Sequence, residues 1–224
     1  MIFFLISLSA AADLDVYEGD DLLTLTSALG PGDEIRLHKG IYLVERTLTW
    51  TALGTEADPV VIKGVEEGVV IQMSEGWLIA AIESSSYIEL RNLHFQGAEG
   101  WESATYGGLQ VENSDHIRVL DCEFSELPGD GISFRGNNTA VEVQDSEFSE
   151  LYGNAIYAGC NDGSCWTDSS IFQENLIHDL HGDSGDGVDL DPGGQGNQIT
   201  DNVIYNVIAN GIVVDATLYG PANI

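Results

Sequence analysis

The hydrophobic positions of this 224-residue chain fall into short pieces that repeat along the sequence. In one set of pieces, each segment ends on a large apolar residue, and these residues follow one another at intervals of 24 to 29 residues. They are Phe95, Phe124, Phe148, Ile177 and Ile204. Such intervals are typical of a solenoid, in which each turn is one repeat and inserted residues lengthen the loops.

A second set of pieces runs in phase with the first and has apolar residues at its second and fourth positions. The pieces span 108–111, 131–134, 155–158, 187–190 and 211–214. Period-two alternation predicts an interior column that contains Ile132, Ile156, Val188 and Ile212. The residues between them then face outward, about 4.8 Å apart on one exposed sheet face. These outward residues are Gln110, Ser133, Tyr157, Asp189 and Val213.

The rest of the chain supports the same fold class. Residues 20–29 have acidic residues at a helix start and apolar residues at helical spacing, which predicts one capping helix. Strand-like pieces follow at 34–38, 40–43, 47–51 and 59–63. With 26 glycines, further helices are disfavoured, and a β-sandwich does not require one pattern at a nearly fixed interval. We predict an all-β, right-handed parallel β-helix with a short N-terminal capping helix.

The two ends of the sequence carry separate expectations. Residues 1–12 form an apolar run that ends in small residues, which is typical of a signal peptide cleaved near Asp13; a buried first strand is the alternative. The run is too short to span a bilayer. We expect a secreted or cell-surface protein with one β-helix domain over 13–224, and a monomer. The last repeat ends near Asp215 without a closing element, so we expect the domain to be truncated at its C-terminus.

The charge balance narrows the choice of partners. Asp and Glu number 37 against 7 Lys and Arg, which gives a formal net charge of -30. Nucleic acid is excluded as a partner because phosphate binding needs a basic surface. Divalent cations are better candidates, and solubility in a salty or extracellular setting is the alternative explanation.

Cysteine and histidine positions indicate structural roles. Cys160 and Cys165 flank a short polar loop and can close a disulfide in an oxidising compartment. Cys122 lies in an alternating strand pattern and is expected to be a buried hydrophobe. His178 and His181 lack a third soft ligand for zinc, so we expect them in a surface loop.

The segment 181–194 is the richest in candidate metal ligands. Four carboxylates, Asp183, Asp186, Asp189 and Asp191, lie among glycines that let the backbone fold tightly around an ion. Calcium takes oxygen ligands of this kind, although the spacing is not that of an EF-hand. The sequence therefore predicts a calcium site here, with an acidic, solvated turn as the alternative.

Other polar residues occupy repeated corner positions. Asp130, Asn154, Asp186 and Asn210 share one position, for which a structural ladder is the first explanation and a ligand-contacting row the second. By the same argument, another corner is expected to contain Asp121, Asp145, Glu174 and Asp201. On the exposed face, Tyr157 can stack on a sugar ring and Arg135 can pair with a uronate carboxylate, or both side chains can simply cover the sheet.

Residues 31–42 and 54–64 resemble the opening turns of the pectate-lyase-like superfamily of parallel β-helices. Within that group, residues 186–190 are similar to the Asp-Asp-Gly-x-Asp-Leu calcium motif of polysaccharide lyase family 9, with Gly185 at the first Asp. The resemblance implies a lysine base on the same sheet and a calcium ion that lowers the pKa of the proton beside the uronate carboxylate. Residues 210–214 are similar to that family's Asn-Gly-Phe-Lys-Leu, with Val213 at the lysine position. No Lys or Arg follows Arg135, so a β-elimination base is unassigned.

Three functions remain open at the level of sequence. The first is a secreted, calcium-dependent, lyase-like protein that acts on an acidic, uronate-containing polysaccharide. The second is a non-catalytic surface or adhesion β-helix that binds glycan or is structural. The third, an inverting galacturonase-type hydrolase, ranks lower because that family's Gly-His-Gly and Arg-Ile-Lys signatures do not occur in the sequence.

Overall fold

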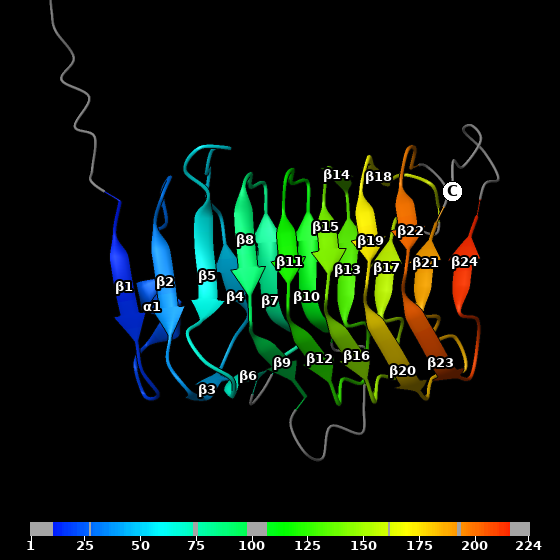
Figure 1. Ribbon diagram of the computed structural model, residues 1–224, viewed down its shortest axis with the longest axis horizontal. Coiled ribbons are helices and arrows are strands. Elements are labelled where there is room, and N and C mark those ends of the chain that lie inside the picture. Colours follow the sequence, from blue (N-terminus) through cyan, green and yellow to red (C-terminus); the bar gives the residue numbers. More distant parts are fainter. Residues whose placement is uncertain are drawn as a thin grey trace, which may run out of the picture.

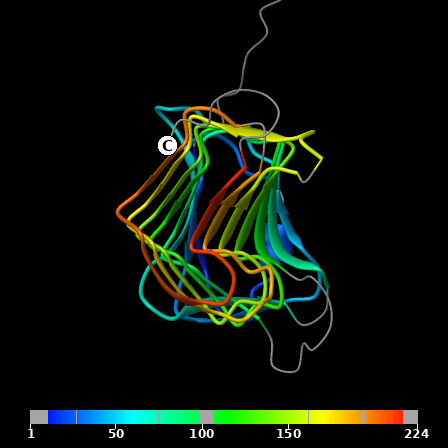
Figure 2. The same cartoon turned by 90° about the vertical axis from the view of Figure 1, so that its right-hand side faces the viewer.

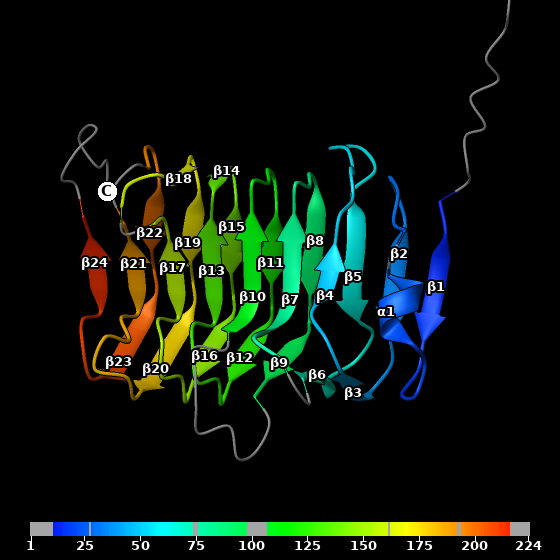
Figure 3. The same ribbon diagram turned by 180° about the vertical axis from the view of Figure 1, so that it is seen from behind.

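The computed structural model describes residues 11–26, 28–73, 76–97, 107–160, 162–191 and 194–215. The strands stack side by side into a right-handed parallel solenoid, as predicted (Figure 1). Each successive turn adds one strand to each of three sheets, here named A, B and C, and the opposite view shows the same stacking from behind (Figure 3). The predicted signal peptide lies outside the described residues except for Ala11 and Ala12, and the segment after Asp215 lies outside them entirely.

The strands of the three sheets alternate along the chain. Sheet A contains β1 Asp13–Val16, β2 Glu34–Leu37, β5 Val60–Gly64, β8 Ile88–Arg91, β11 Arg118–Leu120, β15 Glu142–Gln144, β19 Ile171–Gln173 and β22 Gln198–Thr200. Sheet B contains β3 Gly40–Val44, β6 Val69–Met73, β9 His94–Gln96, β12 Glu123–Ser125, β16 Glu147–Ser149, β20 Leu176–Leu180 and β23 Val203–Val207. Sheet C contains β4 Leu48–Trp50, β7 Leu78–Glu83, β10 Gly107–Glu112, β13 Ile132–Arg135, β17 Ile156–Ala158, β21 Val188–Leu190 and β24 Ile212–Val214. A small sheet D pairs β14 Asn137–Thr139 with β18 Trp166–Asp168.

The helix of the N-terminal region is a single turn, α1 Leu22–Leu25. The prediction of a capping helix is confirmed in kind, but its extent over 20–29 is wrong. Asp21 caps the start by accepting a hydrogen bond from Thr24 N at 3.2 Å. At the other end the hydroxyl of Thr26 donates to the carbonyl of Leu22 at 2.8 Å, a side-chain bond that competes with continuation of the helix. Among the described residues, no helix is long and apolar enough to cross a membrane.

The large apolar residues of the first repeat form one column inside sheet B. Phe95 pairs with Phe124 and Phe124 with Phe148 in register, and the rings stack with centroids 5.0 Å apart in both steps. Ile177 and Ile204 continue the column. The repeat detected in the sequence is therefore the direct consequence of stacking equivalent side chains in a close-packed interior.

The interior column of sheet C also has the predicted register. Ile132 pairs with Ile156, Ile156 with Val188, and Val188 with Ile212. The first three side chains are fully buried, and Ile212, in the last described strand, is half exposed. Viewed along the solenoid axis, the successive turns superpose (Figure 2).

The corner between sheets A and B is held by a buried hydrogen-bond ladder. Cys122 N donates to Ser146 Oγ at 3.1 Å, Ser146 N to Asn175 Oδ1 at 3.0 Å, and Asn175 N to Asn202 Oδ1 at 2.9 Å. The residues just before these positions have left-handed backbone angles, with φ of 52° to 57°. They are Asp121, Asp145, Glu174 and Asp201, so their predicted corner role is confirmed. Each buried backbone donor at this corner is thereby satisfied by the next coil.

Candidate functional site

The outward face of sheet C carries the residues that the sequence placed there. Gln110 pairs with Ser133, Ser133 with Tyr157, Tyr157 with Asp189, and Asp189 with Val213. Because side chains alternate across a strand, the residues two positions further along also face outward. Arg135 lies two positions after Ser133, and Asp191 lies two positions after Asp189. The face therefore carries a cation, Arg135, together with Tyr157 and the carboxylates of Asp189 and Asp191.

A groove lies over this face and the corner that precedes it, with a volume of about 430 Å³. Two exposed aromatic side chains lie on its wall, Trp77 at 65% and Tyr152 at 60% exposure. The polar lining is contributed by Gln110, Asp130, Ser133, Arg135, Asn154 and Ser184. Exposed aromatic rings beside hydrogen-bonding groups are the usual makeup of a site for an amphipathic ligand.

Two residues of the groove lining, Asp130 and Asn154, belong to a hydrogen-bond ladder. Asp130 Oδ1 accepts from Asn154 N at 2.8 Å, Asn154 Oδ1 from Asp186 N at 2.8 Å, and Asp186 Oδ1 from Asn210 N at 2.7 Å. The predicted structural ladder at this corner is therefore confirmed. Burial raises the pKa of Asp130 above its ordinary value, although the hydrogen bond from Asn154 and the charge of Arg135 act in the opposite direction.

Tyr157 faces outward, but it is covered by its neighbours. The Arg135 guanidinium carbon lies 4.1 Å from the centroid of the tyrosine ring, and the tyrosine hydroxyl donates to Asp191 Oδ2. The residue is only 4% exposed and the guanidinium occupies a face of its ring, which agrees with the alternative that Tyr157 and Arg135 cover the sheet. Burial, followed by the hydrogen bond to Asp191, raises the pKa of Tyr157 far above its usual range.

Asp189 is the most electrostatically perturbed carboxylate on this face. Burial, followed by the charges of Asp191, Asp186, Asp130 and Asp215, raises the pKa of Asp189 to about 6. Its Oδ1 is buried and has no hydrogen-bond partner. A carboxylate in this state is stabilised by a proton or by a cation.

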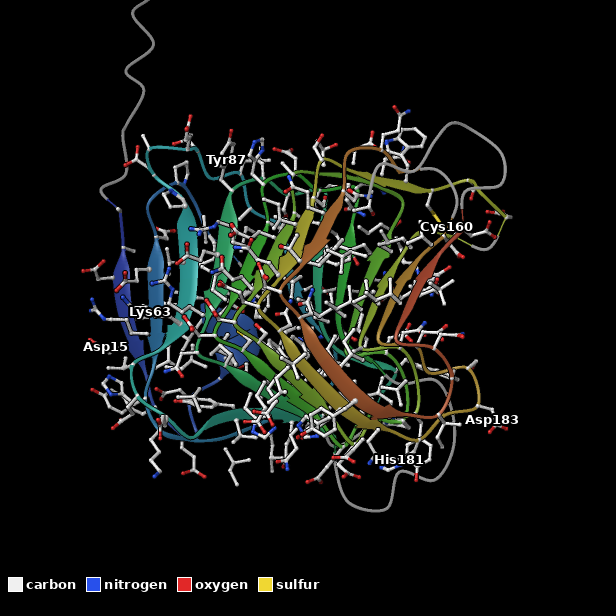
Figure 4. All side chains as sticks on the ribbon, turned by 45° about the vertical axis from the view of Figure 1, so that its right-hand side comes forward. Asp15, Lys63, Tyr87, Cys160, His181 and Asp183 are labelled. Atoms are coloured by element: carbon white, nitrogen blue, oxygen red, sulfur yellow. A yellow bond between two sulfur atoms is a disulfide. The ribbon has the colours of Figure 1, made fainter. Side chains whose placement is uncertain are left out.

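The structure distributes the four predicted calcium ligands over different environments. Asp183 is exposed and lies at the outer edge of the loop before β21 (Figure 4). Asp186 belongs to the corner ladder, and Asp191 binds the Tyr157 hydroxyl. In the described parts of the chain, no three His, Cys, Asp or Glu side chains are grouped as metal ligands, and calcium binding stays a prediction. Val213 pairs directly with Asp189, in the position where the family 9 resemblance implies a lysine.

The cysteines match their predictions. Cys160 and Cys165 form a disulfide with Cα atoms 5.2 Å apart, at the end of the sheet C strands opposite to Asp183 (Figure 4). Cys122 is buried, and burial raises the pKa of its thiol to about 12, which makes it an inert core residue.

The prediction that His178 and His181 lie in a surface loop is wrong for His178. It lies within β20, where Nδ1 is 2.7 Å from Asp179 Oδ2 and Nε2 is 3.1 Å from Glu147 Oε1. His181 follows the strand and contacts Glu150 Oε2 at 2.6 Å. Each imidazole is thus held by carboxylates.

The two aromatic residues that line the groove, Trp77 and Tyr152, were not predicted from the sequence. Trp77 immediately precedes β7, and Tyr152 lies in the turn before β17. Both residues therefore lie at the corner that leads into sheet C. Alignment of the sequence repeats would have shown that an aromatic residue precedes two of the sheet C strands. Their convergence on one groove depends on the path of the loops.

Comparison with solved structures finds a similar fold in an alginate lyase, and two further structures match less well. The alginate lyase from Paenibacillus sp. str. FPU-7 is similar with a TM-score of 0.74 and 17% identity, over 89% of this chain and 68% of that one. The pectate lyase Pel9A matches with a TM-score of 0.47 and 15% identity, over 88% of this chain and 63% of that one. The GH136 lacto-N-biosidase from Eubacterium ramulus matches with a TM-score of 0.46 and 11% identity, over 86% and 56%. Identities this low concern the fold alone.

Comparison of sequences gives the family. No curated protein matches the chain. Residues 79–218, more than half of the chain, match the family described as "Right handed beta helix region". The segment begins within β7 and includes the Asp189 face and the groove residues other than Trp77 and Leu78. The chain belongs to the right-handed β-helix family.

Proposed function

We propose that this protein binds an acidic polysaccharide along the outward face of sheet C and acts on it as a lyase-like β-helix. The observation that carries the proposal is a groove that is lined by the exposed rings of Trp77 and Tyr152 and by Arg135. Aromatic faces stack on the apolar side of sugar rings, and the flanking amides and hydroxyls bind sugar hydroxyls. The alginate lyase of similar fold is consistent with a uronate-containing ligand.

The charge of the lining residues favours a uronate over a neutral sugar. Arg135 is the one cationic side chain among the described lining residues, and it is held in place over Tyr157. A guanidinium binds a carboxylate through paired hydrogen bonds, so Arg135 is positioned to orient one uronate. A chain with a net charge of -30 repels a polyanion at longer range, which a bound cation would offset.

Calcium is part of the proposal, with Asp189 and Asp191 as the ligands to test first. Asp189 offers a buried oxygen without a partner, and its neighbouring carboxylates disfavour its charged form unless a cation is present. When bound to a uronate, calcium lowers the pKa of the proton beside the carboxylate. The chain's own part is to hold the cation and, through Arg135, the sugar carboxylate.

A second candidate is a β-helix that binds glycan without cleaving it. Val213, paired with Asp189, favours this function, because an aliphatic side chain cannot abstract a proton. Both candidates predict binding, and only the first predicts an unsaturated product.

We also propose that the protein is exported. The apolar run over 1–12 is typical of a signal peptide, and the Cys160–Cys165 disulfide is typical of oxidising compartments. Expression in a bacterial host, followed by N-terminal sequencing of the periplasmic protein, should give a chain that begins near Asp13. A chain that stays in the cytosol with residues 1–12 intact would contradict export.

The test measures binding to polymannuronate, polyguluronate and polygalacturonate, with a neutral glucan for comparison. Arg135→Gln should weaken binding to the preferred uronate by about 10-fold to 100-fold, since a charged hydrogen bond contributes about 1.5–3 kcal/mol. Trp77→Ala should weaken it by about 3-fold to 10-fold. Trp166→Ala is the matched control, because Trp166 is also exposed but lies on β18 in sheet D.

The outcomes separate the proposals. Absence of uronate binding, or binding that the Arg135 and Trp77 variants leave unchanged, contradicts the groove as the site. Binding without growth of the ultraviolet absorbance of an unsaturated product supports the non-catalytic candidate. Binding and cleavage that persist in excess chelator remove calcium from the proposal.

A further inference from the structure

A second groove lies over the corner that leads from sheet C into sheet A. Its volume is about 290 Å³, near the lower end of the range for small-molecule sites, which begins at about 300 Å³. The described residues that line it are all different from those that line the groove over sheet C. Tyr87, which belongs to the second groove, lies on the opposite side of the molecule from His181 and Asp183 (Figure 4). The two grooves are therefore separate surfaces.

Part of the lining of this second groove is a row of residues from three successive coils, Tyr87, His116 and Ala140. Parallel bridges between the residues just before them place the three at equivalent positions. All three have left-handed backbone angles, with φ of 52° to 54°. The rings of Tyr87 and His116 stack, with centroids 4.3 Å apart and an angle of 11° between their planes. The row of rings ends at Ala140, whose side chain is a single methyl group, so the groove continues past it.

A row of charged residues lies beside the rings, on the sheet A strands that follow the corner. Glu89, Arg118 and Glu142 pair in register on β8, β11 and β15, and all three line the groove. Arg118 Nη1 donates to Glu89 Oε2 and Arg118 Nε donates to Glu142 Oε2, both at 2.8 Å. A guanidinium held between two carboxylates fixes the position of all three groups. The groove therefore presents hydrogen-bond donors and acceptors in a fixed arrangement next to two stacked rings.

This combination of groups fits a pyranose sugar. The two rings offer flat surfaces to the apolar side of a sugar ring, and Pro59 adds a further apolar surface to the lining. Carboxylates accept hydrogen bonds from sugar hydroxyls, and a guanidinium donates hydrogen bonds to them. A purely apolar ligand would remove Arg118 and Glu142 from water without supplying hydrogen bonds, which is unfavourable.

The charge of the lining indicates a neutral sugar. The described lining residues include three carboxylates, from Glu56, Glu89 and Glu142, and one guanidinium, from Arg118. His116 adds at most one positive charge when it is protonated. The balance stays negative, so this groove repels a uronate and accepts an uncharged sugar.

We propose that this groove binds neutral sugar units of a glycan, with a pyranose ring against Tyr87 and His116 and with its hydroxyls bonded to Arg118 and Glu142. The site is non-catalytic and lies apart from the groove of the proposed function. It gives the protein a second specificity, through which the chain attaches to a neutral glycan. The inference goes beyond the proposed function and does not rest on it.

The test titrates the full chain with neutral tetrasaccharides of β-1,4-linked glucose, mannose or xylose and measures binding by calorimetry. At least one of them should bind the wild type at concentrations up to about 10 mM. Tyr87→Ala should weaken that binding by about 3-fold to 10-fold, because a ring contact is lost, and Tyr87→Phe should retain it. Tyr17→Ala is the matched control, since Tyr17 also stacks on a histidine, His38, with centroids 4.3 Å apart, but does not line the groove.

Histidine ring resonances give a readout that needs no substitution. In NMR spectra, the ring signals of His116 should shift when the tetrasaccharide that binds is added, and those of His38 should not. His116 signals that stay unchanged at saturation overturn the proposal.

Crossed variants separate this site from the groove over sheet C. Trp77→Ala should leave binding of the neutral tetrasaccharide unchanged, and Tyr87→Ala should leave uronate binding unchanged. The proposal is overturned if none of the three neutral tetrasaccharides binds, if Tyr87→Ala binds as tightly as the wild type, or if Trp77→Ala abolishes the binding. Neutral binding that depends on Tyr87, in a protein without affinity for uronates, supports this inference and contradicts the proposed function.

Discussion

Asn175 is the residue at which the contribution of the corner ladder can be measured. The residue is 1% exposed, and its Oδ1 accepts from Ser146 N at 3.0 Å. Its Nδ2 donates to Val143 O at 3.0 Å and to Asn202 Oδ1 at 2.9 Å. Asn175→Ala leaves the Ser146 N–H buried without this acceptor, which costs about 1–3 kcal/mol, and removes two Nδ2 bonds, which contribute about 0.5–1.5 kcal/mol each. The expected loss is about 3 kcal/mol, equivalent to a fall in melting temperature of about 6–12 °C for a chain of this size.

The conservative variant isolates the part of this loss that belongs to the acceptor. Ser146, at the equivalent position one coil earlier, uses its hydroxyl oxygen to accept from Cys122 N at 3.1 Å. A serine at position 175 supplies the same kind of acceptor, so Asn175→Ser should lower the free energy of unfolding by only about 1 kcal/mol. Urea unfolding measures both variants, with Gln198→Ala on the exposed side of β22 as the surface control, expected within about 0.5 kcal/mol of the wild type.

Hydrogen exchange at the Ser146 amide tests the same reasoning locally. Protection of this amide should fall in Asn175→Ala and be retained in Asn175→Ser, because only the alanine variant removes the acceptor. An Asn175→Ala protein as stable as the wild type, or one whose Ser146 amide stays equally protected, refutes the ladder as a stabilising element.

Two further predictions concern charge and cross-linking. The pKa of Asp189, about 6 in the folded state, lies above the unfolded value of about 4, so the folded state retains a proton that the unfolded state has released. In the absence of divalent cations, the free energy of unfolding should therefore fall by on the order of 1 kcal/mol, after allowance for solvent screening, as pH rises from about 4 to 6. Asp189→Asn should flatten this fall. An Asp189→Asn variant with the same pH profile as the wild type would contradict the prediction. Replacing both Cys160 and Cys165 by serine should lower the free energy of unfolding by about 2 kcal/mol, because the unfolded chain regains the entropy lost by closing this short loop. Calorimetry that shows no loss of stability would contradict a stabilising role for the disulfide.

The sequence predicted the solenoid because its repeated positions record the interior directly. Phe124 and Ile156 recur in register because each must fill the same space as its counterparts in the neighbouring coils. The strands of the first coils were also predicted to within two residues at either end, as β2 through β5 show. Alternation along one strand and recurrence between coils are both readable without knowledge of side-chain contacts.

Features that depend on the direction of long side chains or on the paths of loops were not predicted. Tyr157 is covered by Arg135, which lies one coil earlier and two positions along, so its burial follows from the direction of a long side chain. His178 lies within β20, where Asp179 and Glu147 contact its two ring nitrogens, and the sequence does not show these contacts. The groove beside Trp77 is formed where corner loops converge, and loop paths leave no periodic signal in the sequence.

The registers of the three sheets stay constant although the coils differ in length. The side-chain ladder steps from 24 residues between Cys122 and Ser146 to 29 between Ser146 and Asn175, and the extra residues lengthen the connections without shifting the paired strands. Insertions at the corners can therefore change the surface around sheet C while the strands of the packed interior keep the same register. A scaffold of this kind lets new specificities evolve through loop length alone, one coil at a time.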